Sequence, residues 1–69
     1  DLRGLHQTRD YLRWLDRSLS DSAAAGLDMY EVLNIPLPER FRAWGAAATE
    51  YARNVTHLYP RYEQKALTR

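Results

Sequence analysis

The stretch "NVTHLYPRYE", residues 54–63, places His57 between Asn54 and two tyrosines, and histidine is the side chain most often used for proton transfer near neutral pH. On the helix that this region predicts, His57 falls away from the apolar stripe and near Glu50 and Arg53. A solvated position is therefore the favoured interpretation. His6 falls toward the charged side of the first predicted helix, and the same interpretation applies.

Metal and nucleophile motifs are missing from the sequence. The two histidines lie far apart with no HxH or HExxH spacing, and there is no serine elbow, carboxylate pair or glycine-rich phosphate loop. We therefore expect this chain alone to be non-catalytic, with no catalytic residues, no metal ligands and no cofactor.

Two further patterns can each be interpreted either as a functional site or as ordinary helix surface. Asn54-Val55-Thr56 matches the N-glycosylation acceptor pattern, but its position inside a predicted helix argues against modification. Arg9, Arg13 and Arg17 recur at four-residue steps, which could track phosphates. Interleaved aspartates favour a solvated face with local ion pairs instead.

Aromatic residues are the stronger signal, with two tryptophans, five tyrosines and one phenylalanine in 69 residues. A chain this small can hardly enclose them all, so core packing and a docking surface remain equal alternatives. The candidate interaction surface consists of Tyr11, Trp14, Tyr59 and Tyr62.

Length and composition limit the architecture that must position these residues. Sixty-nine residues form one domain, 1–69, with a small core, and the absence of cysteine excludes disulfides. The net charge of +1 is too balanced to indicate nucleic acid. No apolar run approaches about 18 residues, so we expect no membrane span. We also expect no signal peptide within the chain, although one could precede residue 1 in a longer precursor.

Hydrophobic periodicity predicts an all-α fold, a small bundle of three main helices at about 2–25, 28–34 and 38–58. Gly26 suits the end of the first helix, and Asp28 with Glu31 forms a capping box for the second. Pro38 and Glu39 suit the start of the third, while Pro60 should end or bend it, leaving a possible short C-terminal turn. The predicted core is Leu5, Leu12, Leu15, Leu19, Val32, Phe41, Trp44, Ala48, Tyr51, Val55 and Leu58.

Three stretches, "TRDYLRWLDRSLSDSAAAGLDMYEVL", "IPLPERF" and "EYARNVTHLYPRYE", together resemble the helical C-terminal region of metallo-β-lactamase-fold hydrolases, in particular the group associated with quinoprotein dehydrogenases and sulfur oxidation. That region has a long helix with a "YL..L" pattern, a glycine turn with an acidic helix start, and a closing helix with Arg-Asn and Tyr-Glu pairs. The matching positions are Tyr11, Leu12, Leu15, Gly26, Asp28, Glu31, Arg53, Asn54, Tyr62 and Glu63. The family's HxHxDH zinc motif is absent. The resemblance therefore implies a tail without its catalytic core, to which the zinc of a parent hydrolase would belong.

The leading hypothesis is a non-catalytic accessory domain that packs on the catalytic core of a parent hydrolase or on a second copy of itself. The alternative is an independent helical module that binds a partner helix or peptide. A helix-turn-helix nucleic-acid binder is disfavoured by the charge balance. If Tyr11 and Trp14 form an exposed strip, we expect a dimer that Trp14→Ala weakens.

Overall fold

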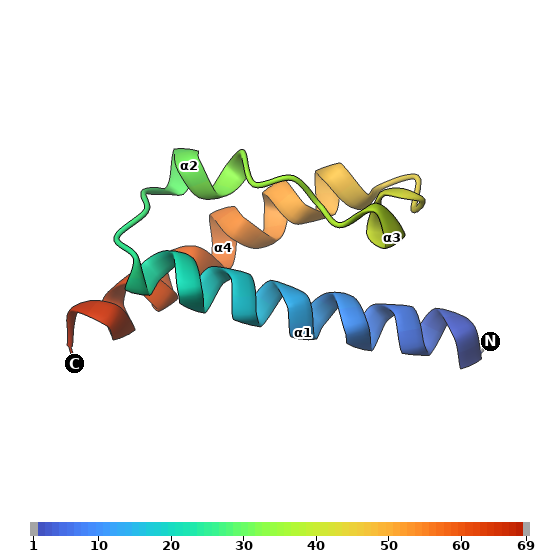
Figure 1. Ribbon diagram of the computed structural model, residues 1–69, viewed down its shortest axis with the longest axis horizontal. Coiled ribbons are helices and arrows are strands. Elements are labelled where there is room, and N and C mark those ends of the chain that lie inside the picture. The colour runs from blue at the N-terminus through green and yellow to red at the C-terminus, as the bar shows by residue number, and fades with distance from the viewer. Residues whose placement is uncertain (1, 69) are drawn as a thin grey trace.

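The computed structural model describes the backbone of residues 2–68 and the side chains of residues 7–68. Its helices are α1 (Leu2–Ala24), α2 (Met29–Leu33), α3 (Glu39–Arg42) and α4 (Ala47–Leu67), and the described residues contain no strand. Figure 1 shows the two long helices, α1 and α4, with α2 on the other side of α4 from α1 and with α3 at the right, between the start of α4 and α1 in that view. The all-α prediction is confirmed.

The first two helices begin and end as the sequence predicts. Gly26 has a φ of +79°, and hydrogen bonds run from Gly26 N to the Ala23 carbonyl and from Leu27 N to the Ser22 carbonyl. These two bonds form the Schellman motif that closes a helix with a left-handed residue. The next helix opens on the predicted capping box, in which Glu31 N donates to Asp28 Oδ1 at 2.8 Å and Asp28 N donates to Glu31 Oε1 at 3.1 Å. The Schellman motif and the capping box together determine where the chain reverses direction between α1 and α2.

The third predicted helix, 38–58, differs from the structure at both ends. The chain forms α3, leaves helical geometry across residues 43–46, and begins α4 at Ala47. Pro60 was expected to end or bend the helix; the first alternative was wrong, because α4 continues through Pro60 to Leu67. The ring costs one backbone hydrogen bond, whereas Tyr59 and Tyr62 on either side make hydrogen bonds to other parts of the fold. These tertiary contacts therefore stabilise α4 by more than Pro60 destabilises it.

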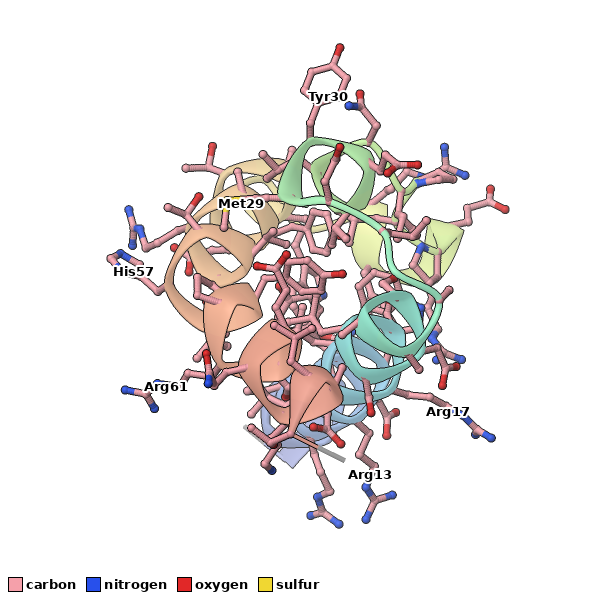
Figure 2. All side chains as sticks on the ribbon, turned by 90° about the vertical axis from the view of Figure 1, so that its left-hand side faces the viewer. Arg13, Arg17, Met29, Tyr30, His57 and Arg61 are labelled. Carbon is pink, nitrogen blue, oxygen red and sulfur yellow. The ribbon has the colours of Figure 1, made fainter. Side chains whose placement is uncertain are left out.

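The core lies between the helices, which surround it when the molecule is viewed end-on in Figure 2. Six of the predicted core residues are buried: Leu15, Leu19, Val32, Phe41, Tyr51 and Val55. Trp44 and Leu58 are partly buried and pack against this cluster. The side chain of Leu5 lies outside the described residues.

Two predicted core residues are exposed. Leu12 is 53% exposed, and on α1 the buried face runs instead through Tyr11, Leu15 and Leu19. Ala48 is exposed because the split between α3 and α4 turns its neighbour Ala47 inward. In both cases the buried residue is the one immediately before the predicted one, Tyr11 instead of Leu12 and Ala47 instead of Ala48. A shift of about 100° around the helix axis is enough to move a side chain from core to solvent.

Candidate functional site

The four residues of the predicted interaction surface do not lie on one exposed strip. Tyr11 is 5% exposed and Tyr59 is 0% exposed, so both belong to the core. Trp14 and Tyr62 are partly buried and pack against the same core. In the monomer, core packing therefore accounts for most of the aromatic signal in the sequence.

Hydroxyl groups of four tyrosines connect α4 to the rest of the chain. Tyr51 Oη donates to the Val32 carbonyl and Tyr59 Oη to the Leu27 carbonyl, each at 2.6 Å. Tyr62 Oη donates to Asp16 Oδ1 at 2.6 Å. These bonds satisfy the phenols that the fold removes from water.

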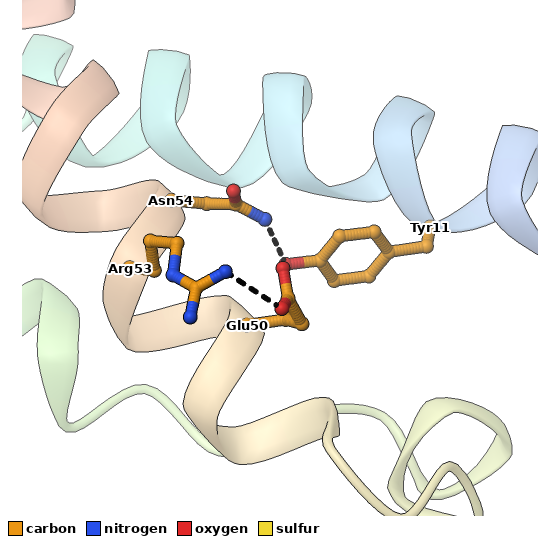
Figure 3. Close-up of polar contacts among 4 residues, drawn as sticks. All are labelled: Tyr11, Glu50, Arg53 and Asn54. Atoms are coloured by element: carbon orange, nitrogen blue, oxygen red, sulfur yellow. Dashed lines mark hydrogen bonds and ion pairs between the residues drawn. The ribbon is translucent and has the colours of Figure 1, made fainter.

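Figure 3 shows the fourth of these contacts, where Asn54 Nδ2 donates to Tyr11 Oη at 2.8 Å. Below it, Arg53 Nη1 pairs with Glu50 Oε1 at 3.2 Å. Burial raises the pKa of Tyr11, the Asn54 bond lowers it, and the Glu50 charge raises it. Tyr11 is therefore a neutral phenol at physiological pH and unsuited to act as a base. The amide of Asn54 is engaged between two helices, which agrees with the expectation that it is not a glycosylation acceptor.

The other tyrosines of this network also stay protonated. Burial is the main cause that raises the pKa of Tyr51 to about 12, and the hydrogen bond to Asp16 is the main cause that raises the pKa of Tyr62 to about 12. Burial, with nearby carboxylates, also raises the pKa of Tyr59. Such shifts favour the protonated phenol, so these groups act as hydrogen-bond donors rather than nucleophiles.

His57 is exposed, as predicted, and Figure 2 shows it pointing into solvent from α4 near Arg61. The side chain of His6 lies outside the described residues. Within the described part of the chain, no group of three or more histidine, cysteine, aspartate or glutamate side chains could hold a metal ion.

The surface does contain an apolar groove, which we call the 33–52 groove. One wall is the segment after α2, and the other is the end of α3 together with the first turns of α4. The cavity is about 550 Å³, and its apolar lining includes Leu33, Ile35, Leu37, Trp44, Ala48 and Ala52. Arg42 is the one charged side chain among the lining residues that the structure describes.

The prolines explain why one wall of this groove exists. Pro36 and Pro38 disfavour helical geometry at the residues before them, so residues 35–37 run without regular structure between α2 and α3. Ile35 and Leu37 are consequently only partly buried. From the sequence, "IPLP" predicts a break between two helices but not a groove. The sequence signal for the groove was that Ile35 and Leu37 each precede a proline, in a segment too short to bury these two apolar side chains.

No helix within residues 2–68 is long and apolar enough to cross a membrane. Comparison of the chain with models of protein families, with curated proteins and with solved structures found no match.

Proposed function

We propose that this chain is a non-catalytic helical protein-interaction module, and that the 33–52 groove binds an amphipathic helix of a partner protein. The observation that carries the proposal is an open apolar groove on a domain whose core is already closed. Leu19, Val32, Val55 and Tyr59 are 0% exposed without any contribution from a partner. The groove is therefore apolar surface that the fold itself leaves uncovered.

Exposed apolar surface of this kind is unfavourable in water, by roughly 25 cal/mol per Å². Leu33 is 37% exposed at the rim, and Ile35, Leu37 and Trp44 are only partly covered. A contiguous apolar depression on a small protein is typical of a binding site, whereas single exposed apolar residues are ordinary.

The shape of the groove favours a helix over other peptide conformations. The described residues include no strand edge to which an extended peptide could add. A proline-rich ligand docks between several exposed aromatic faces, but among the described lining residues only Trp44 offers a partly exposed ring, because Tyr51 is buried with its hydroxyl bonded to Val32. On the α4 wall, Ala48 and Ala52 are small and exposed one turn apart, which allows another helix to approach closely.

Charge specifies one further property of the partner. Arg42 borders the groove, and no described side chain forms an ion pair with it. An acidic residue beside the apolar face of the bound helix would pair with this guanidinium. The expected ligand is therefore an amphipathic helix with leucine-like anchors at helical spacing and a flanking carboxylate.

The proposal can be tested by selecting binders from a displayed library of random peptides and measuring their affinities by calorimetry. We expect helix-forming, acidic peptides whose affinity falls at least about tenfold in Ala48→Arg, which fills the groove. Thr49→Arg is the matched control, because Thr49 is exposed on the same helix and does not line the groove. Failure to select any peptide, or equal binding by wild type and Ala48→Arg, would refute the proposal.

A second copy of this chain is the competing occupant, and sedimentation of the same variants distinguishes it. Dimerisation that Ala48→Arg abolishes and selected peptides prevent would assign the groove to self-association. The dimer expected from an exposed Tyr11–Trp14 strip stays a prediction, and its basis is reduced because Tyr11 is buried. If that strip nevertheless mediates dimerisation, Trp14→Ala should weaken the dimer and Ala48→Arg should not.

The accessory-domain hypothesis also stays a prediction, and the same groove would then pack on the zinc-binding core of a parent hydrolase. Leu33 and the partly covered Leu37 offer such a core an apolar docking face. An HxHxDH-bearing segment encoded upstream in the same reading frame would favour this role. The intact mass of the protein from its native source would likewise distinguish a domain of a longer hydrolase from an independent module.

A further inference from the structure

A second depression lies away from the 33–52 groove, over Trp14. Its cavity is about 390 Å³ and is lined by Asp10, Arg13, Trp14, Arg17 and Arg40. Three guanidinium groups from two separate helices, α1 and α3, thus border one partly buried indole. Arg13 and Arg17 extend from α1 into solvent in Figure 2.

Four of the eight carboxylates whose side chains the structure describes are engaged elsewhere. Asp16 accepts the hydrogen bond of Tyr62, and Glu50 pairs with Arg53. Asp28 and Glu31 bond to backbone amides in the capping box. Of the other four, only Asp10 lines the depression over Trp14.

The arginines around Trp14 are not neutralised in this way. Arg13, Arg17 and Arg40 form no ion pair with any side chain among residues 7–68. Asp10 is the one acidic lining residue in this described set, so the depression is locally basic although the whole chain has a net charge of only +1.

The interleaved aspartates favoured local ion pairs on this face, but among the described side chains none of them pairs with Arg13 or Arg17. Arg13 and Arg17 lie four residues apart on one helix, a spacing at which like charges repel and destabilise the helix. Arg40 is held in place, with its guanidinium carbon 4.7 Å from the centre of the Phe41 ring. Trp14 is also fixed, since its ring lies 6.0 Å from that of Phe41 and 5.6 Å from that of Tyr51.

We propose that this depression binds an acidic segment of a partner protein, with carboxylates paired to Arg13, Arg17 and Arg40 and an apolar side chain placed on Trp14. Guanidinium groups suit carboxylates because they donate two parallel hydrogen bonds. The site is separate from the 33–52 groove and does not depend on its function. A nucleic-acid backbone fits less well, because Asp10 borders the site and the balanced charge of the chain supplies little long-range attraction.

The test is a titration of the isotope-labelled protein with the capped peptide Glu-Asp-Leu-Glu-Asp, followed by nitrogen–proton correlation spectra. We expect the indole N–H of Trp14 and the backbone amides of Arg13, Arg17 and Arg40 to shift. Added salt should weaken binding. The double variant Arg13→Gln/Arg17→Gln should reduce affinity at least about tenfold while the helices remain intact, because glutamine is a good helix former.

Two controls make the result specific. Arg61→Gln removes the same charge from α4, where Arg61 points away from Arg13 and Arg17 (Figure 2), and should change affinity by about twofold or less. The amide peptide Gln-Asn-Leu-Gln-Asn should not bind. Equal loss in Arg61→Gln, equal binding of the amide peptide, or no shifts at millimolar peptide would overturn the proposal. So would inorganic phosphate that shifts the same signals at equal concentration, because it would show a site for small anions instead.

Discussion

The hydroxyl of Tyr59 on α4 donates a 2.6 Å hydrogen bond to the carbonyl of Leu27, the residue that follows the glycine turn after α1. The bond spans 32 residues of sequence and lies beneath the start of α2. The bond therefore connects the late part of α4 to the turn between α1 and α2. Tyr59 acts through this contact as part of the fold rather than as part of a docking surface.

Tyr59→Phe should lower the free energy of unfolding by about 1–2 kcal/mol, because it removes the hydrogen bond and keeps the ring. Denaturant unfolding followed by circular dichroism measures this change. Tyr30→Phe is the matched control, since Tyr30 is 74% exposed and the same substitution should have almost no effect there. Equal effects of the two substitutions would show that the Leu27 contact contributes nothing.

Stability should fall as the pH rises from about 10 to about 12. The pKa of Tyr51 and that of Tyr62 are each raised to about 12, whereas in the unfolded chain tyrosine titrates near 10. In this window the unfolded state loses protons that the folded state keeps, so each further increase in pH favours unfolding. Below pH 10 both states are protonated, and the contribution of these tyrosines is constant.

Unfolding measured across this pH range, together with tyrosinate absorbance, tests the expectation. Tyr51→Phe should make the decline less steep, whereas Tyr30→Phe should leave its slope nearly unchanged. Tyrosinate absorbance that develops fully near pH 10 while the helices remain folded would contradict the prediction.

Gly26→Ala should destabilise the protein by about 1 kcal/mol, because a side chain at a φ of +79° is strained whatever space surrounds it. Gly45→Ala is the internal comparison. Gly45 does not have a positive φ, and nothing lies within 4 Å of the added methyl group. Alanine there should be neutral or stabilise by about 0.4–1 kcal/mol through the unfolded state. Thermal melts of the two variants should therefore shift in opposite directions, or Gly45→Ala should not shift at all.

Local signals in the sequence correctly predicted the end of α1 and the start of α2. The Gly26 turn and the Asp28–Glu31 capping box each depend on residues a few positions apart, so no tertiary information was needed. The exact buried face of α1 depended on what α4 places opposite it. Asn54 of α4 donates to the Tyr11 hydroxyl, and the rings of Phe41 and Trp44 lie against the Tyr11 ring, whereas periodicity alone favoured Leu12.

The candidate sites were less predictable for the same reason. The 33–52 groove brings Leu33 and Leu37 next to Ala52, and such proximity between distant segments has no local signature. The depression over Trp14 needs Arg40 from α3 beside the α1 arginines. The four-residue spacing of Arg13 and Arg17 was visible in the sequence, but the commitment of Asp16 to Tyr62 was not.

Pro60→Ala tests how α4 tolerates its internal proline. A proline inside a helix removes one backbone hydrogen bond and can cost about 3 kcal/mol or more, while Pro60 is exposed and its ring contributes little burial. We therefore expect the substitution to stabilise the protein by about 1–3 kcal/mol. Arg61→Ala, at the next exposed position, should change stability by less than about 0.5 kcal/mol.

If Pro60→Ala instead destabilises the protein, the geometry that proline imposes on α4 is what directs Tyr59 toward Leu27 and Tyr62 toward Asp16. The combination Pro60→Ala with Tyr59→Phe separates these cases, because the two effects add if the proline acts only on the helix and fail to add if it positions Tyr59.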